Sequence, residues 1–138
     1  GNSDVVMTSD DPDGDGPNPP VETVVGNLVA GASYSGTVQV LNRLENPAEN
    51  ITEEVEEEAD EHQFFFIQDG ALDITTTYDN FDGDGNPLGT EFTVDAGAAS
   101  TGVWRVVLIH EGKKPNDGTL ADAGGETDID VRFNVVVQ

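Results

Sequence analysis

Two segments of the sequence have the residue types and spacing of a calcium-binding loop. The candidate ligands are Asp11, Asp13, Asp15 and Glu22 in the first segment and Asn80, Asp82, Asp84 and Glu91 in the second. In such loops, positions one, three and five direct oxygens at the ion, a glycine at six permits the turn, and an acid at twelve completes the shell. The spacing therefore predicts calcium as a cofactor. The alternative is a pair of ordinary acidic turns, because Asp-Gly and Asn-Pro sequences form turns without an ion.

Signatures of catalysis are weak. His62 and His110 are the only histidines, and nothing in the sequence brings them together. The run that starts His110-Glu111 resembles the beginning of a zinc-protease motif, but Lys114 stands where the second histidine ligand is required. The chain also lacks the glycine-flanked serine of a nucleophile elbow. We therefore expect a protein that is not an enzyme.

The charge balance restricts the partners of the protein. The 138 residues include 28 Asp and Glu against 5 Lys and Arg, which gives a formal net charge of −23. Nucleic acid is bound through basic side chains, and anionic membrane surfaces also attract basic segments, so neither suits this chain. Excess carboxylates repel one another at low ionic strength, whereas a Debye length of about 3 Å in molar salt screens the repulsion. The composition is typical of a halophilic protein, or of one whose carboxylates collect divalent cations.

The chain has features of an exported protein. It contains no cysteine, which excludes a disulfide framework and thiolate chemistry. No segment approaches the roughly 20 apolar residues of a membrane span, so we expect no membrane insertion of the mature chain. The opening residues lack the basic and apolar regions of a signal peptide. Asn50 begins a glycosylation sequon. We expect a secreted protein, extracellular or on the cell surface, with Asn50 as a candidate glycosylation site.

Short β-patterned runs separated by Gly, Asp, Asn and Pro dominate the chain. The last of them alternates apolar and polar residues as a half-buried strand does, whereas the run of Phe64, Phe65 and Phe66 is apolar on both faces. Strands are predicted at Asp4–Met7, Val21–Val25, Tyr34–Val40, Gln63–Gln68, Leu72–Tyr78, Phe92–Val94, Gly102–His110 and Asp128–Val137. This spacing predicts an all-β fold, an antiparallel β-sandwich of the jelly-roll or Ig-like type.

One segment departs from the β pattern. This segment is Thr52–His62, in which seven acidic side chains fall among the nine residues 53–61. Apolar residues are spaced four apart at Ile51 and Val55, and Asn50 and Glu53 have the spacing of a capping box. The segment therefore predicts one short acidic surface helix. A solvated acidic strand or loop is the alternative, because the same residues also alternate and a run of charge is often a hydrated face.

The N-terminal residues 1–20 are expected to form a unit of their own, with the sandwich domain at residues 21–138. The unit consists of a short apolar strand, made of Asp4, Val5, Val6, Met7 and Thr8, and an Asp/Gly/Pro linker. A strand of this kind can complete the sheet of a neighbouring subunit, and such a contact repeated head to tail builds an open filament. Alternatively, the strand lies at the edge of a sheet in its own chain.

Two other stretches carry a family resemblance. The first runs from Leu28 through the turn at Gly31 and an alternating strand to Asn42, and the second is the closing strand from Val131 to Gln138. They resemble secreted fibre subunits of the TasA/camelysin type, which include archaeal bundling pilins, and less closely the calcium-dependent cannula subunits of archaea. The resemblance implies a jelly-roll sandwich, export, and polymerisation by donation of the N-terminal strand to the next subunit.

We therefore expect a structural subunit of an extracellular filament, a pilus or a biofilm-matrix fibre, that polymerises with copies of itself and that calcium stabilises. One alternative is a secreted, calcium-stabilised module that binds carbohydrate or a cell surface. Trp104, Tyr34 and Tyr78 would then supply a stacking surface, although the strand around Trp104 favours a core position for that residue. A second alternative is a structural protein of a virus of halophiles, which would share the fold and the mode of assembly.

Overall fold

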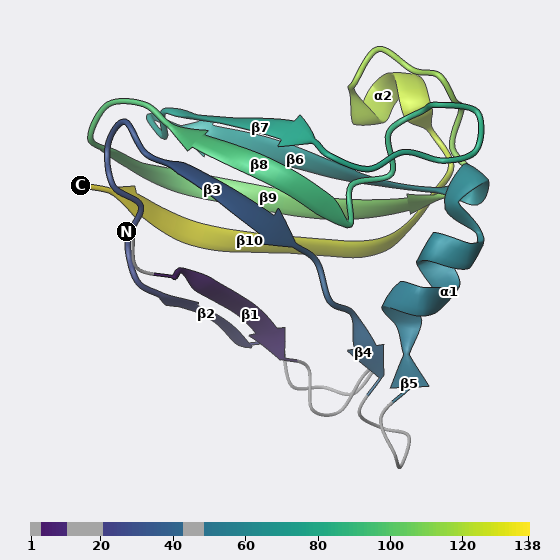
Figure 1. Cartoon of the computed structure of the whole chain (residues 1–138), viewed down its shortest axis with the longest axis horizontal. Helices are drawn as coiled ribbons and strands as arrows, with labels where there is room; N and C mark the ends of the chain where they lie inside the picture. Colours follow the sequence, from purple (N-terminus) through teal and green to yellow (C-terminus); the bar gives the residue numbers. More distant parts are fainter. Residues whose placement is uncertain (1–3, 11–20, 43–48) are drawn as a thin grey trace.

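The computed structural model describes residues 4–10, 21–42 and 49–138. Two antiparallel three-stranded sheets dominate this part of the chain, with strand orders β10-β9-β6 and β3-β8-β7, and Figure 1 shows them as two layers. Their strands are β3 (Ser33–Thr37), β6 (His62–Gly70), β7 (Ile74–Tyr78), β8 (Glu91–Ala96), β9 (Ser100–His110) and β10 (Glu126–Val137). The predicted antiparallel β-sandwich is therefore confirmed.

The main core lies between the two sheets, and the period-two alternation of the strands builds it. Along β10, Phe133 and Val135 are buried, whereas Arg132 and Asn134, which alternate with them, are exposed. Both sheets contribute aromatic rings, which stack or tilt against one another with centroids 4.8 to 5.6 Å apart: Phe66, Phe92 and Trp104. Aromatic packing of this kind adds to the burial of apolar area. Trp104 is 5% exposed and belongs to the core, as its strand predicted.

A second, smaller core explains why β6 is apolar on both faces. Phe64 joins the main core, while Phe65 points to the other side of its sheet and packs with Val107 and Ile109 of β9. A four-residue helix, α2 (Leu120–Ala123), covers this face and contributes Ala123. Because the sequence pattern of α2 is too short to show a helical period, the sequence did not predict it.

The acidic helix predicted near residues 52–62 is present as α1 (Ile51–Glu57). The side chain of Asn50 caps it by accepting a hydrogen bond from the Glu53 N–H at 3.4 Å, and Val55 is its buried apolar contact. The helix ends earlier than predicted, because a 3₁₀ turn, η1 (Ala59–Glu61), leads into β6. Two short paired strands, β4 (Leu41–Asn42) and β5 (Glu49–Asn50), precede the helix.

The N-terminal strand lies in a hairpin beside the sandwich. β1 (Val6–Asp10) pairs antiparallel with β2 (Val21–Val25) as a separate two-stranded sheet, which lies next to β10 in Figure 1. β1 begins later than the predicted Asp4–Met7. After β2, Leu28 forms a parallel bridge with Val137, so the two stretches that carry the family resemblance meet in space. Among the described helices, none has the length and apolar character that crossing a membrane requires.

Candidate functional site

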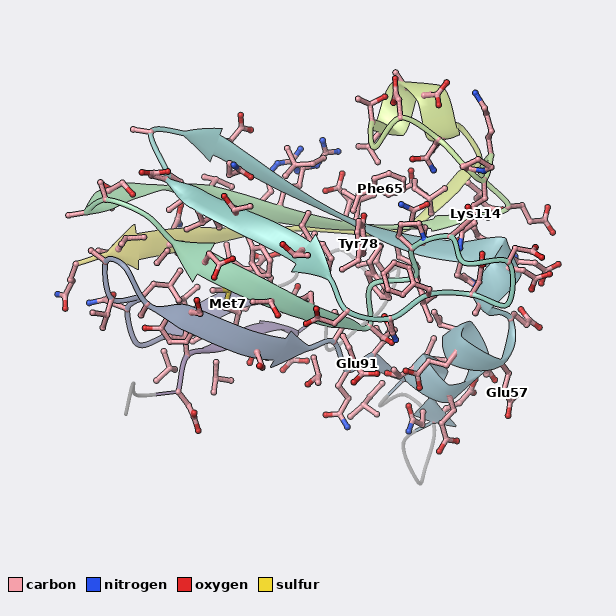
Figure 2. All side chains as sticks on the ribbon, turned by 45° about the horizontal axis from the view of Figure 1, so that its top comes forward. Met7, Glu57, Phe65, Tyr78, Glu91 and Lys114 are labelled. Atoms are coloured by element: carbon pink, nitrogen blue, oxygen red, sulfur yellow. The ribbon has the colours of Figure 1, made fainter. Side chains whose placement is uncertain are left out.

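The predicted donor strand occupies a defined place in its own chain. Of its residues, Val6, Met7 and Thr8 lie in β1, and Asp4 and Val5 directly precede it. Val5 and Met7 pack against the main core together with Val24, which lies opposite Met7 on β2; Met7 is labelled in Figure 2. In the single chain β1 is therefore the edge strand of its own hairpin, which is one of the two arrangements that the sequence left open.

The outer face of the same hairpin carries three valines that are open to solvent. Val6 and Val25 lie opposite each other and are 54% and 60% exposed, and Val21 further along β2 is 60% exposed. These three residues make up what we call the valine face. Three exposed valines on one small sheet differ from the scattered apolar residues that any surface carries, so the valine face is a candidate contact surface.

The second predicted calcium loop is held by protein donors. The Asn80 side-chain oxygen accepts hydrogen bonds from the N–H groups of Gly89 at 3.0 Å and Glu91 at 3.1 Å. One oxygen of Asp82 accepts from the N–H groups of Asp84 at 2.9 Å and Asn86 at 3.0 Å. Asp82 therefore acts as a turn former, the role that Asx side chains commonly have, and Asn80 ties the start of the loop to its end.

The other oxygen of Asp82 meets a cation that the chain itself supplies. The Lys114 ammonium donates to it at 3.1 Å, and also to the carbonyls of Ala59 at 2.8 Å and Pro87 at 3.1 Å. Both charged side chains are buried: that of Lys114 is 8% exposed and that of Asp82 is 1% exposed. Figure 2 shows Lys114 at the end of the sandwich where α1 joins β6. All three ammonium protons are thus used, and the Asp82 carboxylate is neutralised without a metal.

The electrostatics of Asp82 agree with this geometry. Burial acts to raise the pKa of the carboxyl group, but the hydrogen bonds from the Asn86 N–H, the Lys114 ammonium and the Asp84 N–H, with the lysine charge, outweigh burial, so the pKa lies below its ordinary value. Opposite charge and donated hydrogen bonds both favour the ionised form. Asp82 is therefore a paired anion at neutral pH.

Among the described residues, Asp82, Asp84 and Glu91 do not form a group whose ligand atoms all lie within 4.8 Å of one another. The Asp84 and Glu91 side chains are exposed, and Glu22 in β2 accepts a hydrogen bond from the Ser9 hydroxyl at 3.3 Å. This arrangement argues against a calcium shell built from Asn80, Asp82, Asp84 and Glu91. The predicted ligands Asp11, Asp13 and Asp15 lie outside the described residues, so calcium at the first segment stays a prediction.

The other predicted surface groups have structural contacts. Asn50 caps α1 with its side-chain oxygen, and glycosylation at this residue stays a prediction. The Tyr34 hydroxyl accepts from the Val29 N–H at 2.9 Å, and the Tyr78 hydroxyl donates to the Phe64 carbonyl at 2.6 Å. Burial raises the pKa of Tyr78. With Trp104 in the core, these aromatic residues do not form the exposed stacking surface that a carbohydrate-binding module would need.

Sequence reasoning missed a group of residues at the end of the first sheet. His62 begins β6 and His110 ends β9, and the two lie directly opposite each other in the antiparallel register. Their rings stack with centroids 4.6 Å apart and planes 5° apart. The potential ligand atoms of Glu58, His62 and His110 lie within 4.8 Å of one another. Only the pairing of β6 with β9 in this register brings the histidines together, and no local pattern signals it.

No protein-family model, curated protein or solved structure significantly matches this chain. The geometry of the described residues therefore carries the functional argument, and the resemblance to the TasA/camelysin type stays a prediction.

Proposed function

We propose that the protein is a structural subunit of an extracellular filament and that its subunits join by exchanging β1. The supporting observation is the position of β1 in the single chain. Among the described strands β1 pairs only with β2, and Val5 and Met7 fill a place between the hairpin and the core. Every copy of the chain thus contains both a strand and the place that receives it.

When β1 is exchanged, the contacts that it makes in its own chain form between two copies instead. The incoming β1 would pair with β2 in the same register and bury the same side chains, which makes swapping of an identical element a low-cost route to assembly. Residues 11–20 connect β1 to β2. Fully extended at about 3.3–3.6 Å per residue, a linker of this length spans up to about 35 Å. A linker of this length can carry β1 up to that distance away from β2.

The valine face gives the exchanged hairpin a second role. Exchange of β1 satisfies the inner face, whereas Val6, Val21 and Val25 remain exposed and would be buried where filaments or successive subunits touch. The net charge of −23 opposes close approach at low ionic strength, and molar salt screens it. We therefore propose that assembly requires high salt, with calcium at Asp11, Asp13 and Asp15 as an additional neutralising contribution.

A pair of engineered cysteines tests the exchange directly, because the chain has no cysteine of its own. Met7 and Val24 are directly opposite, and opposed residues of antiparallel strands have Cα atoms about 4.5–5.5 Å apart, within the range of a disulfide. In Met7→Cys/Val24→Cys protein assembled in molar salt and then oxidised, we expect covalent ladders on a non-reducing gel. Oxidation of the protein before assembly should lock β1 in its own hairpin and block polymers.

The control is Thr8→Cys/Val24→Cys, whose residues are neighbours in the ladder but lie on opposite faces of the hairpin; it should form no ladder. Deletion of residues 1–8 should abolish sedimenting polymers and leave the sandwich folded by circular dichroism. Large polymers in which Met7→Cys/Val24→Cys cross-links only within one chain would contradict strand exchange. A monomer at every salt concentration, with and without calcium, would contradict the filament itself.

A further inference from the structure

Imidazole and carboxylate groups from three elements gather at one end of the first sheet. Glu58 caps the C-terminus of α1, His62 begins β6 and His110 ends β9. On the far side of His110, Glu126 begins β10 directly opposite it, and Asp128 follows two residues later. His110, Glu126 and Asp128 also bring potential ligand atoms within 4.8 Å of one another. His110 is thus the centre of two overlapping groups of donors.

The surroundings of His62 prepare one of its nitrogens for a metal. The residue is 6% exposed, and its Nδ1 lies 3.0 Å from the carbonyl oxygen of Glu58. Because a carbonyl can only accept, Nδ1 carries the proton, and in the neutral ring the lone pair is then on Nε2. Metal-binding histidines are commonly oriented in this way, with the second ring nitrogen donating to a backbone carbonyl.

The charges around the pair favour a cation. His110 has Asp128 on one side, with Nδ1 and Oδ2 3.8 Å apart, and Glu111 on the other, with Nε2 and Oε1 3.8 Å apart. The two lysines that follow in the sequence are engaged elsewhere, Lys113 with Asp122 and Lys114 with Asp82. Negatively charged carboxylates around a site raise the local concentration of cations.

We propose that Glu58, His62 and His110 bind a divalent transition-metal ion of the zinc class and thereby fasten the end of α1 to β6 and β9. Two imidazoles and a carboxylate are ligands of zinc and related ions, whereas calcium prefers an all-oxygen shell. The remaining coordination position is left to water. Asp128 or Glu111 then accepts the free N–H of His110 and orients its ring.

Binding requires a movement of two ligands, Glu58 and His110. Zinc–nitrogen distances of about 2.0–2.1 Å place tetrahedral ligand atoms about 3.3 Å apart, which is closer than the 4.8 Å limit that the donors satisfy. The Glu58 side chain is exposed, and the His110 side chain is 29% exposed. Because stacked rings hold their lone pairs in parallel planes, binding requires the His110 ring to rotate out of its stack with the buried His62.

Titration of the full, tag-free chain with zinc chloride tests the site, after treatment with a chelator that is then removed. We expect one saturable ion per chain by isothermal titration calorimetry, in the presence of a large excess of calcium that occupies weak carboxylate sites. Because the chain has only two histidines, their ring signals are easily followed by NMR, and both should shift in proportion to the bound zinc. Cobalt in place of zinc should show the visible absorption of a four-coordinate ion.

Variants distinguish this site from the general acidity of the surface. His110→Gln removes a partly exposed ligand, and Glu58→Gln removes the carboxylate; each should weaken zinc binding at least tenfold. Glu53→Gln, on the first turn of the same helix, removes an equal charge away from the site and should bind as the native chain does. Circular dichroism checks that each variant is folded.

Three results would overturn the proposal. Zinc binding that excess calcium abolishes would assign the ion to surface carboxylates. Saturable binding without a shift of either histidine signal would place the ion elsewhere. A His110→Gln variant that is folded and binds zinc with native affinity would exclude His110 as a ligand. None of these results bears on strand exchange, which has its own test in the paired cysteines.

Discussion

Two groups of polar side chains bind neighbouring carbonyls in the short turn between α1 and β6, and they treat cations differently. Lys114 donates to the Ala59 carbonyl and neutralises Asp82, so this group contains its own cation. His62 donates to the adjacent Glu58 carbonyl. Its partners, His110 and the Glu58 carboxylate, supply potential metal ligands and no lysine or arginine. The group with a calcium-loop spacing is complete without a metal, whereas the group without any motif is open to one.

The difference shows that a ligand motif has meaning only together with the side chains that pack against it. Positions one, three and five of a calcium loop supply the oxygens that can bind the ion. The spacing does not determine whether a metal ion or a hydrogen-bond donor of the protein occupies those oxygens. Here the ammonium group of Lys114, which comes from a distant loop, donates to three acceptors and takes the place that a bound cation would have. Three predictions test this comparison.

The largest effect is expected from removing the internal cation. Lys114→Met keeps most of the length of the side chain but leaves the buried Asp82 carboxylate without an ion partner and removes the ammonium donor from the Pro87 carbonyl. The Ala59 carbonyl still accepts from the His62 N–H. Breaking a buried pair by removing one partner costs about 3–5 kcal/mol. The free energy of unfolding, measured with urea at constant molar salt, should fall by that amount.

The adjacent lysine is the matched control. Lys113 pairs with Asp122 at 2.9 Å, but its side chain is 61% exposed, and surface pairs contribute little. Lys113→Met should therefore leave the free energy of unfolding close to the native value. An equal loss of stability in the two variants would contradict the distinction between a buried structural cation and a surface one.

A smaller effect is expected in acid. The pKa of Asp82 in the folded protein lies below its ordinary value of 3.8, so its stabilising contribution is complete above that value and is lost as the pH falls through the folded pKa. Asp82→Asn lacks this contribution at every pH. The difference in free energy of unfolding between the native chain and Asp82→Asn should be constant above about pH 5 and shrink at lower pH. A difference that grows in acid would contradict the pairing.

No effect is expected from the exposed acids of the same loop. Asp84→Asn combined with Glu91→Gln removes two predicted calcium ligands, but the structure gives neither side chain a place in a shell with Asp82. The double variant should bind calcium as the native chain does and gain the same thermal stability from it. Calcium-dependent stabilisation that disappears in the double variant would show that the loop opens and binds the ion after all.

Several elements of the fold could be predicted because their causes are local. The alternation of β10 and the double-sided apolar run of β6 depend on side chains only a few residues apart, and Asn50 needs only Glu53 to cap α1. By contrast, α2 is four residues long and depends on covering Phe65. No local pattern contains that second face, so no sequence window predicted the helix.

By itself, the sequence determined the β-rich character, the acidic surface and the apolar N-terminal strand, since composition and period are properties of short segments. Tertiary structure alone decided which charges and ligands meet. Lys114 reaches Asp82 across two loops, and His62 lies opposite His110 because β6 and β9 pair in that register. Contacts between distant residues depend on how strands pair and loops close. A sequence pattern identifies the groups that can bind a cation. Whether a lysine ammonium or a metal ion is bound to them depends on the packing of the folded chain.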